Sequence, residues 1–362
     1  MGNSSIIKND LKIIRLNSTD AIHDTDHLLS FKNLVLSNED MYPNIDKWVR
    51  DKVLPGLKTS ERVGYIGYLN DSPVISSVLK KGKHAKFCHL KIDKSLQDDN
   101  LGEAFFALMT LEARQEAQEI HFTLPESLWD SKKEFFQSFG FKDAIKSKDQ
   151  YRLFEEELKC SAPYDIVQKA VLQKLPKLSR KFSINGHSMA NSLLMSIKPE
   201  NAEKIFHRDK KVEIRRKFST KWIGEDICIY VSQPSACLMG EASIKNVVRG
   251  SPNYIWDQYH SEINSSKEEF DDYVSSMEEV YAIELANINA YRQMVPISQL
   301  MFLGNSELVP PQSYQILENS KPWSQAVSMA ALLHGSTSTN SRNTTSPKEK
   351  KGFNQISFPF IN

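Results

Sequence analysis

Paired cysteines, long apolar runs and a strong net charge are all missing from this 362-residue chain. The four cysteines are scattered, which excludes a disulfide framework and gives no metal-binding spacing. No apolar run reaches about 18 residues and no signal-peptide pattern is present, so we expect no membrane partner. The net charge of +1 gives no overall case for nucleic acid. We expect a cytoplasmic protein of about two domains.

The charge that is present is unevenly distributed. Between Lys169 and Lys221 there are 14 Lys and Arg against 4 Asp and Glu, a local net charge of +10. Between Glu262 and Glu284 one lysine stands against 8 acids, a local net charge of −7. The basic block could bind phosphate, because each phosphate that it neutralises releases counterions. Alternatively, both blocks are solvated faces or pair with each other.

Hydrophobic periodicity predicts an α+β order of elements up to residue 157. Residues 1–10 are polar, and we expect them to be loose. Pro55 and Gly56 should stop the second helix. The predicted elements are a strand (11–16), two helices (23–36 and 45–54), three antiparallel strands (63–69, 74–79 and 84–92), a helix (101–118), a strand (120–123), a helix from Pro125 and a strand (150–154).

Two segments of this region carry a resemblance to a known family. Strand residues 89–92 lead through Gln97-Asp98-Asp99-Asn100-Leu101-Gly102 into a helix, and Phe135-Phe136-Gln137-Ser138-Phe139-Gly140-Phe141 follows. Over residues 11–157 the chain resembles the GNAT N-acetyltransferases, which implies a mixed sheet flanked by helices and acetyl-CoA as cofactor. The residues that the resemblance assigns to the cofactor are Leu90, Ile92, Gln97, Asp98, Asn100, Leu101 and Gly102.

The chemistry of such a loop is simple. Backbone amides and the helix dipole favour the pyrophosphate of coenzyme A, and small residues let it approach. The chain departs from the family pattern at Asn100, which replaces a glycine, although asparagine tolerates a positive φ. It also departs by adding carboxylates near the phosphate position, on Asp98, Asp99 and Glu103.

The catalytic groups are less clearly marked. Phe136 stands where many of these enzymes keep a tyrosine as general acid. His84, His89 and Glu103 are possible general bases by location, and we take His89 and Glu103 as the catalytic candidates. The alternative is that a histidine on a strand is structural.

Residues 158–191 connect this region to the next. Apolar residues at helical spacing predict an amphipathic helix from Tyr164 to Leu175, ended by Pro176. Residues 182–189 are predicted to be linker. The helix either docks one domain on the other or contacts nucleic acid.

The segment 193–216 organises the remainder of the chain. A short strand ends at Lys198-Pro199, a helix follows, and a second strand carries Lys210, Glu213 and Arg215 at the spacing K-x-x-E-x-R. Alternation puts Glu213 and Arg215 on one face, opposite two apolar residues. On these residues alone, a solvated basic edge strand is an equal alternative.

This pattern resembles the start of the ASCH domain, a PUA-like β-barrel linked to RNA. The family usually has a glycine where this chain has Arg208. Further segments in the same order extend the likeness over residues 190–315, namely 226–230 (DICIY), Gly240, Trp256, the helix around 270–273 and 310–313 (PPQS).

The ASCH resemblance implies a barrel that binds RNA or a nucleotide-linked substrate through Lys210, Glu213, Arg215 and Trp256. Trp256 either offers a stacking face to a base or packs under a loop. Some ASCH proteins are amidohydrolases of acetylated cytidine that use a lysine and a threonine. Glu213 occupies the threonine position here.

The sequence thus predicts an N-acyltransferase that depends on acetyl-CoA and carries an ASCH domain for RNA or a nucleotide-linked substrate. Two alternatives stay open: a regulatory RNA-binding protein with a degenerate GNAT domain, and a hydrolase or nuclease carried by the ASCH domain. The predicted divisions are a flexible start (1–10), a GNAT-like domain (11–157), a basic helix and linker (158–191), an ASCH-like barrel (192–318), a helix (319–335) and a disordered tail (336–362).

Overall fold

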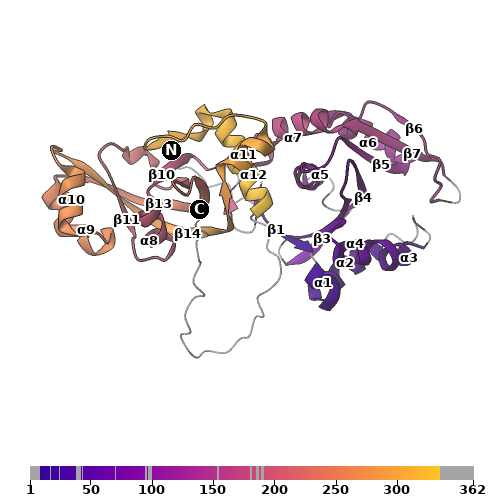
Figure 1. The fold of residues 1–362 in the computed structure, drawn as a ribbon, viewed down its shortest axis with the longest axis horizontal. Coiled ribbons are helices and arrows are strands. Elements are labelled where there is room, and N and C mark those ends of the chain that lie inside the picture. The colour runs from indigo at the N-terminus through magenta and orange to yellow at the C-terminus, as the bar shows by residue number, and fades with distance from the viewer. Residues whose placement is uncertain are drawn as a thin grey trace.

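The computed structural model describes residues 9–16, 18–23, 25–37, 42, 44–69, 71–93, 96, 100–152, 155–179, 182–184, 187–188 and 191–334. Two sheets lie along the long axis of the molecule, with helices between them (Figure 1). The chain is α+β, as predicted: a mixed nine-stranded sheet flanked by helices is followed by a six-stranded sheet curved into a half-barrel. The predicted disordered tail lies outside the described residues.

The larger sheet has the strand order β6-β7-β5-β4-β3-β2-β1-β8-β9. Neighbouring strands are antiparallel, except that β4 runs parallel to β5 and β1 to β8. Its strands are β1 (Asn9–Leu16), β2 (Arg62–Leu69), β3 (Ser72–Lys80), β4 (His84–Ile92), β5 (Glu119–Pro125), β6 (Ala144–Lys146), β7 (Glu157–Pro163), β8 (Phe182–Ile184) and β9 (His187–Ser188).

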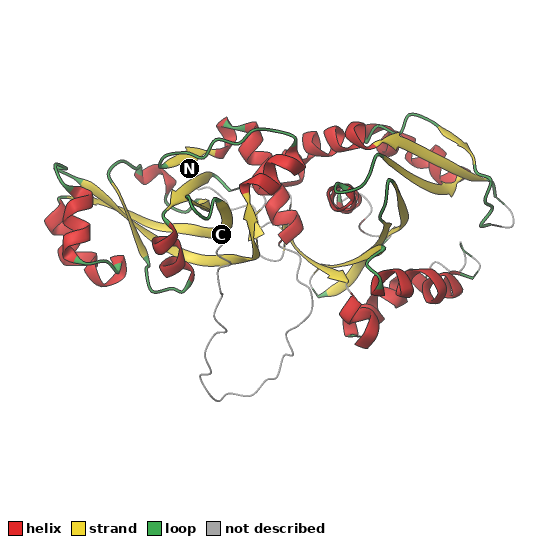
Figure 2. Cartoon of the chain, in the orientation of Figure 1, coloured by secondary structure: helices red, strands yellow, loops and turns green. Residues whose placement is uncertain are grey.

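Helices cover both faces of this sheet (Figure 2). On one face α2–α4 bury Phe31, Val49 and Leu57, and on the other α5 and α7 bury Phe105 and Val171. These helices are α1 (Ser18–His23), α2 (Asp26–Leu36), α3 (Ile45–Trp48), α4 (Leu54–Lys58), α5 (Leu101–Ala113), α6 (Glu126–Ser138) and α7 (Tyr164–Ser179).

The predicted helix stop at Pro55 is wrong, because the helix widens before the proline. After α3 the chain makes a π turn over Val49–Val53, in which the Leu54 N–H donates to the Val49 carbonyl. The wider turn displaces the carbonyl that the proline ring would otherwise strike, so α4 continues to Lys58. Gly56 is required there, since a β-carbon would lie 2.6 Å from the Arg62 side chain.

Helix α5 is buried on nearly all sides rather than along the single stripe that the periodicity predicted. It lies between the larger sheet and α7, with Phe106 at the centre of an aromatic cluster. It ends at Ala113 and not at residue 118, because the chain turns back to the sheet. There the N–H groups of Gln118 and Glu119 donate to the Lys83 carbonyl, and β5 begins.

The strand predicted at 150–154 and the linker predicted at 182–189 are both wrong in their described residues. Gln150 bridges the loop between β6 and β7: its Nε2 donates to the Ser147 carbonyl, and its Oε1 accepts the Glu157 N–H. The segment predicted as linker supplies β8 and β9. Because β8 pairs with the start of β1, Asn9 is part of the sheet and not of a loose end.

The smaller sheet has the order β11-β14-β13-β12-β10-β15, and bulges bend the long pair β13 and β14. The strands predicted around 193, 212, 227, 242 and 280 are confirmed. The elements are β10 (Leu193–Ile197), α8 (Pro199–Phe206), β11 (Val212–Arg215), β12 (Asp226–Val231), β13 (Cys237–Gly250), α9 (Pro252–Ile263), α10 (Lys267–Val274), β14 (Val280–Pro296), α11 (Ile297–Gly304), β15 (Tyr314–Ile316) and α12 (Lys321–His334).

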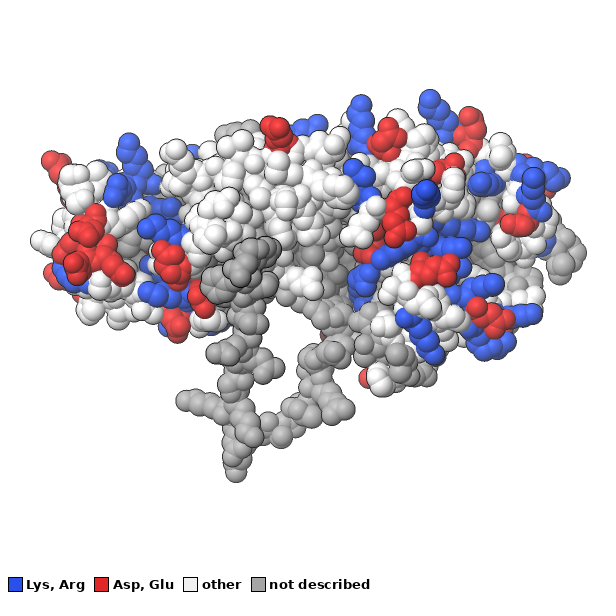
Figure 3. All heavy atoms as spheres, viewed as in Figure 1, with Lys and Arg blue, Asp and Glu red and all other residues white. Residues whose placement is uncertain are grey.

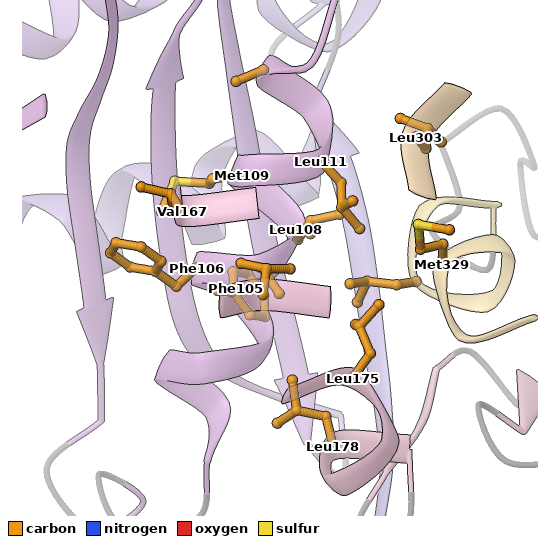
Figure 4. Packing of buried hydrophobic residues seen from close by; sticks show 14 of the residues in the cluster. Phe105, Phe106, Leu108, Met109, Leu111, Val167, Leu175, Leu178, Leu303 and Met329 are labelled. Carbon is orange, nitrogen blue, oxygen red and sulfur yellow. The ribbon is translucent and has the colours of Figure 1, made fainter. Parts of the chain in front are cut away.

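The two halves of the chain share one hydrophobic core. Met329 of α12 and Leu303 of α11 belong to the same buried cluster as Leu108 of α5 and Leu175 of α7 (Figure 4). The middle of the molecule, over α11 and α12, is nearly free of charged atoms on the face seen in Figure 3. Docking of one half on the other is therefore the role of α7 that the structure supports. No helix among the described residues is long and apolar enough to cross a membrane.

A proline and a glutamine fix the contact between α7 and α12. Helix α7 does not end at Pro176, as predicted, but continues to Ser179. Proline has no N–H, so the carbonyl of Leu172, four residues earlier, lacks its helical donor. Gln325 of α12 replaces that donor, with its Nε2 2.8 Å from the Leu172 oxygen. Similarly, Gln168 of α7 donates to the carbonyl of Leu303 near the end of α11.

Gln325→Leu should lower the free energy of unfolding by about 1–3 kcal/mol, because it leaves a partly buried carbonyl unpaired. In a Pro176→Ala background the cost should fall below half, since residue 176 then supplies an N–H. Urea denaturation of the four chains in this cycle measures the coupling. Exposed Gln258→Leu on α9 is the control and should change little. Equal costs in both backgrounds would contradict the account.

Candidate functional site

The parallel strands β4 and β5 part into a wedge. They pair only near their starts, as His84↔Glu119, Ala85↔Ile120 and Lys86↔His121. Beyond those pairs β4 stays with β3 and β5 with β7, and no described strand pairs with the edges that they turn toward each other. Open strand edges bind extended chains through N–H and C=O groups. The wedge can therefore receive an extended ligand that carries amide groups, such as the pantetheine arm of coenzyme A.

The N-terminus of α5 lies against the open end of the wedge. A β-carbon on Gly102 would lie 3.0 Å from Ile92 Cδ1, so the glycine lets the first helical turn approach the end of β4. Asn100, just before the helix, has a φ of 62°, the left-handed conformation expected where the family has glycine. Its side chain donates to Glu103 Oε2 at 2.7 Å and makes no cap to the helix N–H groups.

Glu103 does not act as a free carboxylate in this arrangement. Its Oε1 lies 3.3 Å from Nζ of Lys174, which reaches the start of α5 from α7. The N-terminus of a helix attracts phosphate, and a carboxylate there opposes this attraction. The Lys174 ammonium group offsets the negative charge of Glu103. Lys174 also lies 4.8 Å from the centre of the Phe139 ring.

The described part of the predicted cofactor site fits coenzyme A. Leu90 and Ile92 are partly buried on the α5 side of β4, and Leu101 and Gly102 are buried at the helix start. Together they bring a strand edge and a helix N-terminus to one place, which suits an amide-bearing arm that ends in a diphosphate. Gln97, Asp98 and Asp99 lie outside the described residues.

Phe136 is part of an aromatic cluster. Its ring lies 5.0 Å from that of Phe122 and 5.9 Å, stacked, from that of Trp129. The side chain therefore has a packing role, and it has no proton to give to a leaving thiolate.

The structure does not bring His89 and Glu103 together. His89 lies on the α2–α4 face of β4, where its Nε2 is 3.0 Å from Ser76 Oγ and its ring 6.3 Å from that of Trp48. Burial, helped by the charge of Lys91, lowers the pKa of His89 to about 3. At neutral pH the imidazole is uncharged and a weak base.

His121 of β5 is a functional candidate that the sequence analysis missed. It stands opposite Lys86 at the closed end of the wedge, and its Nδ1 lies 4.0 Å from a carboxylate oxygen of Glu119. Burial, helped by the charges of Lys159 and Lys86, lowers its pKa to about 4. Alternation within the predicted strand 120–123 could have given its face, but not its position beside β4.

The three residues of the K-x-x-E-x-R pattern meet in a buried charge cluster. Glu213 lies 3.7 Å from Lys210 Nζ and 3.2 Å from an Arg215 nitrogen, and each side chain is less than a tenth exposed. Lys210 also donates to the Ile263 carbonyl and Arg215 to that of Ser196. Burial lowers the pKa of Lys210 although Glu213 opposes the shift. β11 is an edge strand, but its charged face is not solvated.

Trp256 does not join this cluster. It lies on α9 with its ring 5.0 Å from that of Phe270, and Lys267 Nζ is 5.4 Å from the indole. These residues pack near Val212 and Ile214, on the opposite face of β11 from Glu213. Packing is the role that this position supports.

Arg208 occupies the position of the family's glycine with a φ of 68°. This left-handed conformation follows the end of α8 and explains why glycine is favoured there. Its guanidinium donates to the Ile288 carbonyl at 3.1 Å, which ties the turn to β14. Of the basic block, Lys210 and Arg215 are thus buried, and Arg208, although exposed, donates to the protein's own backbone.

Comparisons with known proteins find partial similarities. Residues 192–306 match a family described as a domain of unknown function (DUF365). Among solved structures, ASCH from Zymomonas mobilis is 27% identical, with a TM-score of 0.34, over 36% of this chain and 91% of that one. A probable acetyltransferase from Staphylococcus epidermidis is 17% identical, with a TM-score of 0.33, over 42% of this chain and 98% of that one.

A curated relative, the ATP synthase subunit alpha of Ureaplasma parvum serovar 3, is 28% identical over 103 residues. That match covers 28% of this chain and 13% of the relative. The structural neighbours thus include a GNAT-type and an ASCH fold.

The position of His89 predicts a pH dependence of stability. Between pH 7 and pH 5 the unfolded chain gains a proton on this histidine, whose ordinary pKa is about 6.5, while the folded chain does not. Lowering the pH therefore lowers the stability of the folded protein. Between pH 7 and pH 5 the free energy of unfolding of wild type should decrease by about 2 kcal/mol more than that of His89→Gln. Urea denaturation at both pH values measures this, with exposed His23→Gln as the control. Parallel losses in wild type and His89→Gln would show that His89 is not buried in its neutral form.

Proposed function

We propose that the N-terminal half is an acetyl-CoA-dependent N-acyltransferase whose cofactor lies in the wedge between β4 and β5. The observation that carries the proposal is the parting of two parallel strands next to the N-terminus of α5. The edge of β4 offers hydrogen bonds to the amides of pantetheine, and the helix start offers a positive dipole to the diphosphate. The GNAT resemblance of residues 89–102 agrees with this assignment.

The transfer is a direct displacement. The nitrogen of an amine attacks the thioester carbonyl carbon, the C–S bond breaks, and the proton lost by the nitrogen passes to the thiolate through water. The products are an amide and free coenzyme A. Since Phe136 cannot supply a proton, the roles of general acid and base fall to water or to groups near the closed end of the wedge.

A second candidate is a regulatory protein that binds acetyl-CoA without turnover. Two observations favour it: His89 is a weak base, and Glu103 is occupied by Lys174 and Asn100. In either case, the role of the half-barrel in binding RNA or a nucleotide-linked substrate stays a prediction. So does its alternative role as a hydrolase or nuclease. To contact the buried side chains of Lys210, Glu213 and Arg215, a ligand would have to reach below the surface.

Calorimetry with acetyl-CoA tests the proposal. Wild type should bind in the micromolar range, and Gly102→Glu should weaken binding by at least about tenfold, because a carboxylate then stands at the diphosphate position. S-acetylpantetheine, which lacks the diphosphate, should bind weakly and equally to both chains. The measurement with S-acetylpantetheine shows whether the wedge is still formed in Gly102→Glu.

Asn253→Glu is the matched control, since it adds the same charge at an exposed helix start in the other half. It should bind acetyl-CoA as wild type does. Failure of wild type to bind acetyl-CoA would overturn the proposal. Binding without acetyl transfer to any amine would favour the regulatory candidate.

A further inference from the structure

The outer face of β4, β5 and β7 is the side from which an acyl acceptor can reach the wedge. The inner face is filled by α5 and the aromatic cluster, with Phe105, Phe106 and Phe139 fully or nearly fully buried. On the outer face, by contrast, His84 is 71% and Ile145 66% exposed. An amine that attacks a thioester in the wedge must therefore come from the outer face.

Three adjacent strands place Lys86, His121 and Lys159 together on this outer face. Lys86 pairs with His121, and His121 pairs with Ser161 of β7. Lys159 lies two residues from Ser161, so alternation gives it the same face. Both lysines are close enough to act on the charge of His121.

Acids also lie near this face: Glu157 of β7 pairs with Arg152, and Asp149 accepts from the Tyr151 hydroxyl at 3.4 Å. On the same strands Glu119 lies 3.5 Å from His84 Nδ1 and 4.0 Å from His121 Nδ1. Nδ1 of His121 is buried, without a hydrogen-bond partner among the described residues. Two ammonium groups beside a neutral imidazole, which offers both a donor and an acceptor, form a surface suited to a phosphate group.

An aromatic ring and a hollow adjoin the lysines. Lys86 Nζ lies 5.4 Å from the centre of the Tyr151 ring, and that side chain is 42% exposed. On the other side, Lys159 borders a hollow of about 390 Å³, whose lining also includes Lys142, Asp143, Ile145 and Ser161. Exposed rings bind bases by stacking, and a hollow of this size suits a small ligand.

We infer that the acyl acceptor carries a nucleotide, with its phosphate between Lys86 and Lys159 and its base against Tyr151. That the nucleotide is the acyl acceptor rests on the proposed function, whereas the nucleotide-binding surface does not. It also puts nucleotide binding in the N-terminal half, near the wedge, whereas the sequence placed it in the barrel.

The test uses adenosine 5′-monophosphate and ligand-detected NMR on the full chain. Lys86→Gln with Lys159→Gln should raise the Kd for the nucleotide by at least about fivefold and reduce its dependence on salt. Adenosine should bind more weakly than the nucleotide, and it should bind equally to wild type and to the Lys86/Lys159 variant. Tyr151→Ala should weaken binding of both compounds, while Tyr151→Phe should not.

The controls separate this inference from the proposed function. Lys132→Gln with Lys133→Gln removes the same charge from exposed sites on α6 and should bind the nucleotide as wild type does. Acetyl-CoA binding should be unchanged in the Lys86/Lys159 variant. Equal nucleotide affinity in wild type and that variant would overturn the inference and leave the transferase proposal standing. Inorganic phosphate binding as tightly as the nucleotide would overturn the assignment of a base site.

Discussion

The packing of α12 onto α7 and α5 is the contact on which the arrangement of the molecule depends. It is an apolar contact, and two buried glutamines complete it by donating to carbonyls that a proline and a helix end leave open. Because α5 is covered by this layer as well as by the sheet, it is held from both halves. The start of α5 is also one wall of the candidate cofactor site. The candidate cofactor site and the docking of the halves therefore share one element.

Burial sorts the charged residues of this chain into two groups. Glu213 pairs with both Lys210 and Arg215 within the half-barrel, where an unpaired charge would be costly. Lys86 and Lys159 stay near the surface at the closed end of the wedge. The outer face of β4, β5 and β7 is thus the surface that we propose for a charged ligand.

Much of this architecture follows from the sequence. Alternation and helical spacing predicted the strands around Leu11, Val63 and Leu193, and Asn100 has the positive φ that asparagine tolerates. The misses have physical causes. A π turn carried a helix past Pro55, Gln325 stabilised α7 past Pro176, and contact with β1 ordered the segment expected to be linker. Local pattern does not show Gln325 or β1, since both come from distant parts of the chain.

The sequence predicted the individual segments of the site better than their arrangement in space. The motif around Gly102 identified a helix start near a strand end, but the parting of β4 and β5 appears only once the strands are paired. Likewise, K-x-x-E-x-R placed Glu213 and Arg215 on one face, yet periodicity could not tell a solvated edge from a buried cluster. His121 was overlooked because its neighbours Lys86 and Lys159 lie on other strands.

Hydrogen exchange with and without acetyl-CoA tests the central claim most directly. With acetyl-CoA bound, we predict slower amide exchange in residues 87–92 of β4, 122–125 of β5 and 100–104 at the start of α5. The strands of the half-barrel should be unaffected. Protection confined to the half-barrel, or no protection at saturating acetyl-CoA, would contradict the assignment of the wedge as the cofactor site.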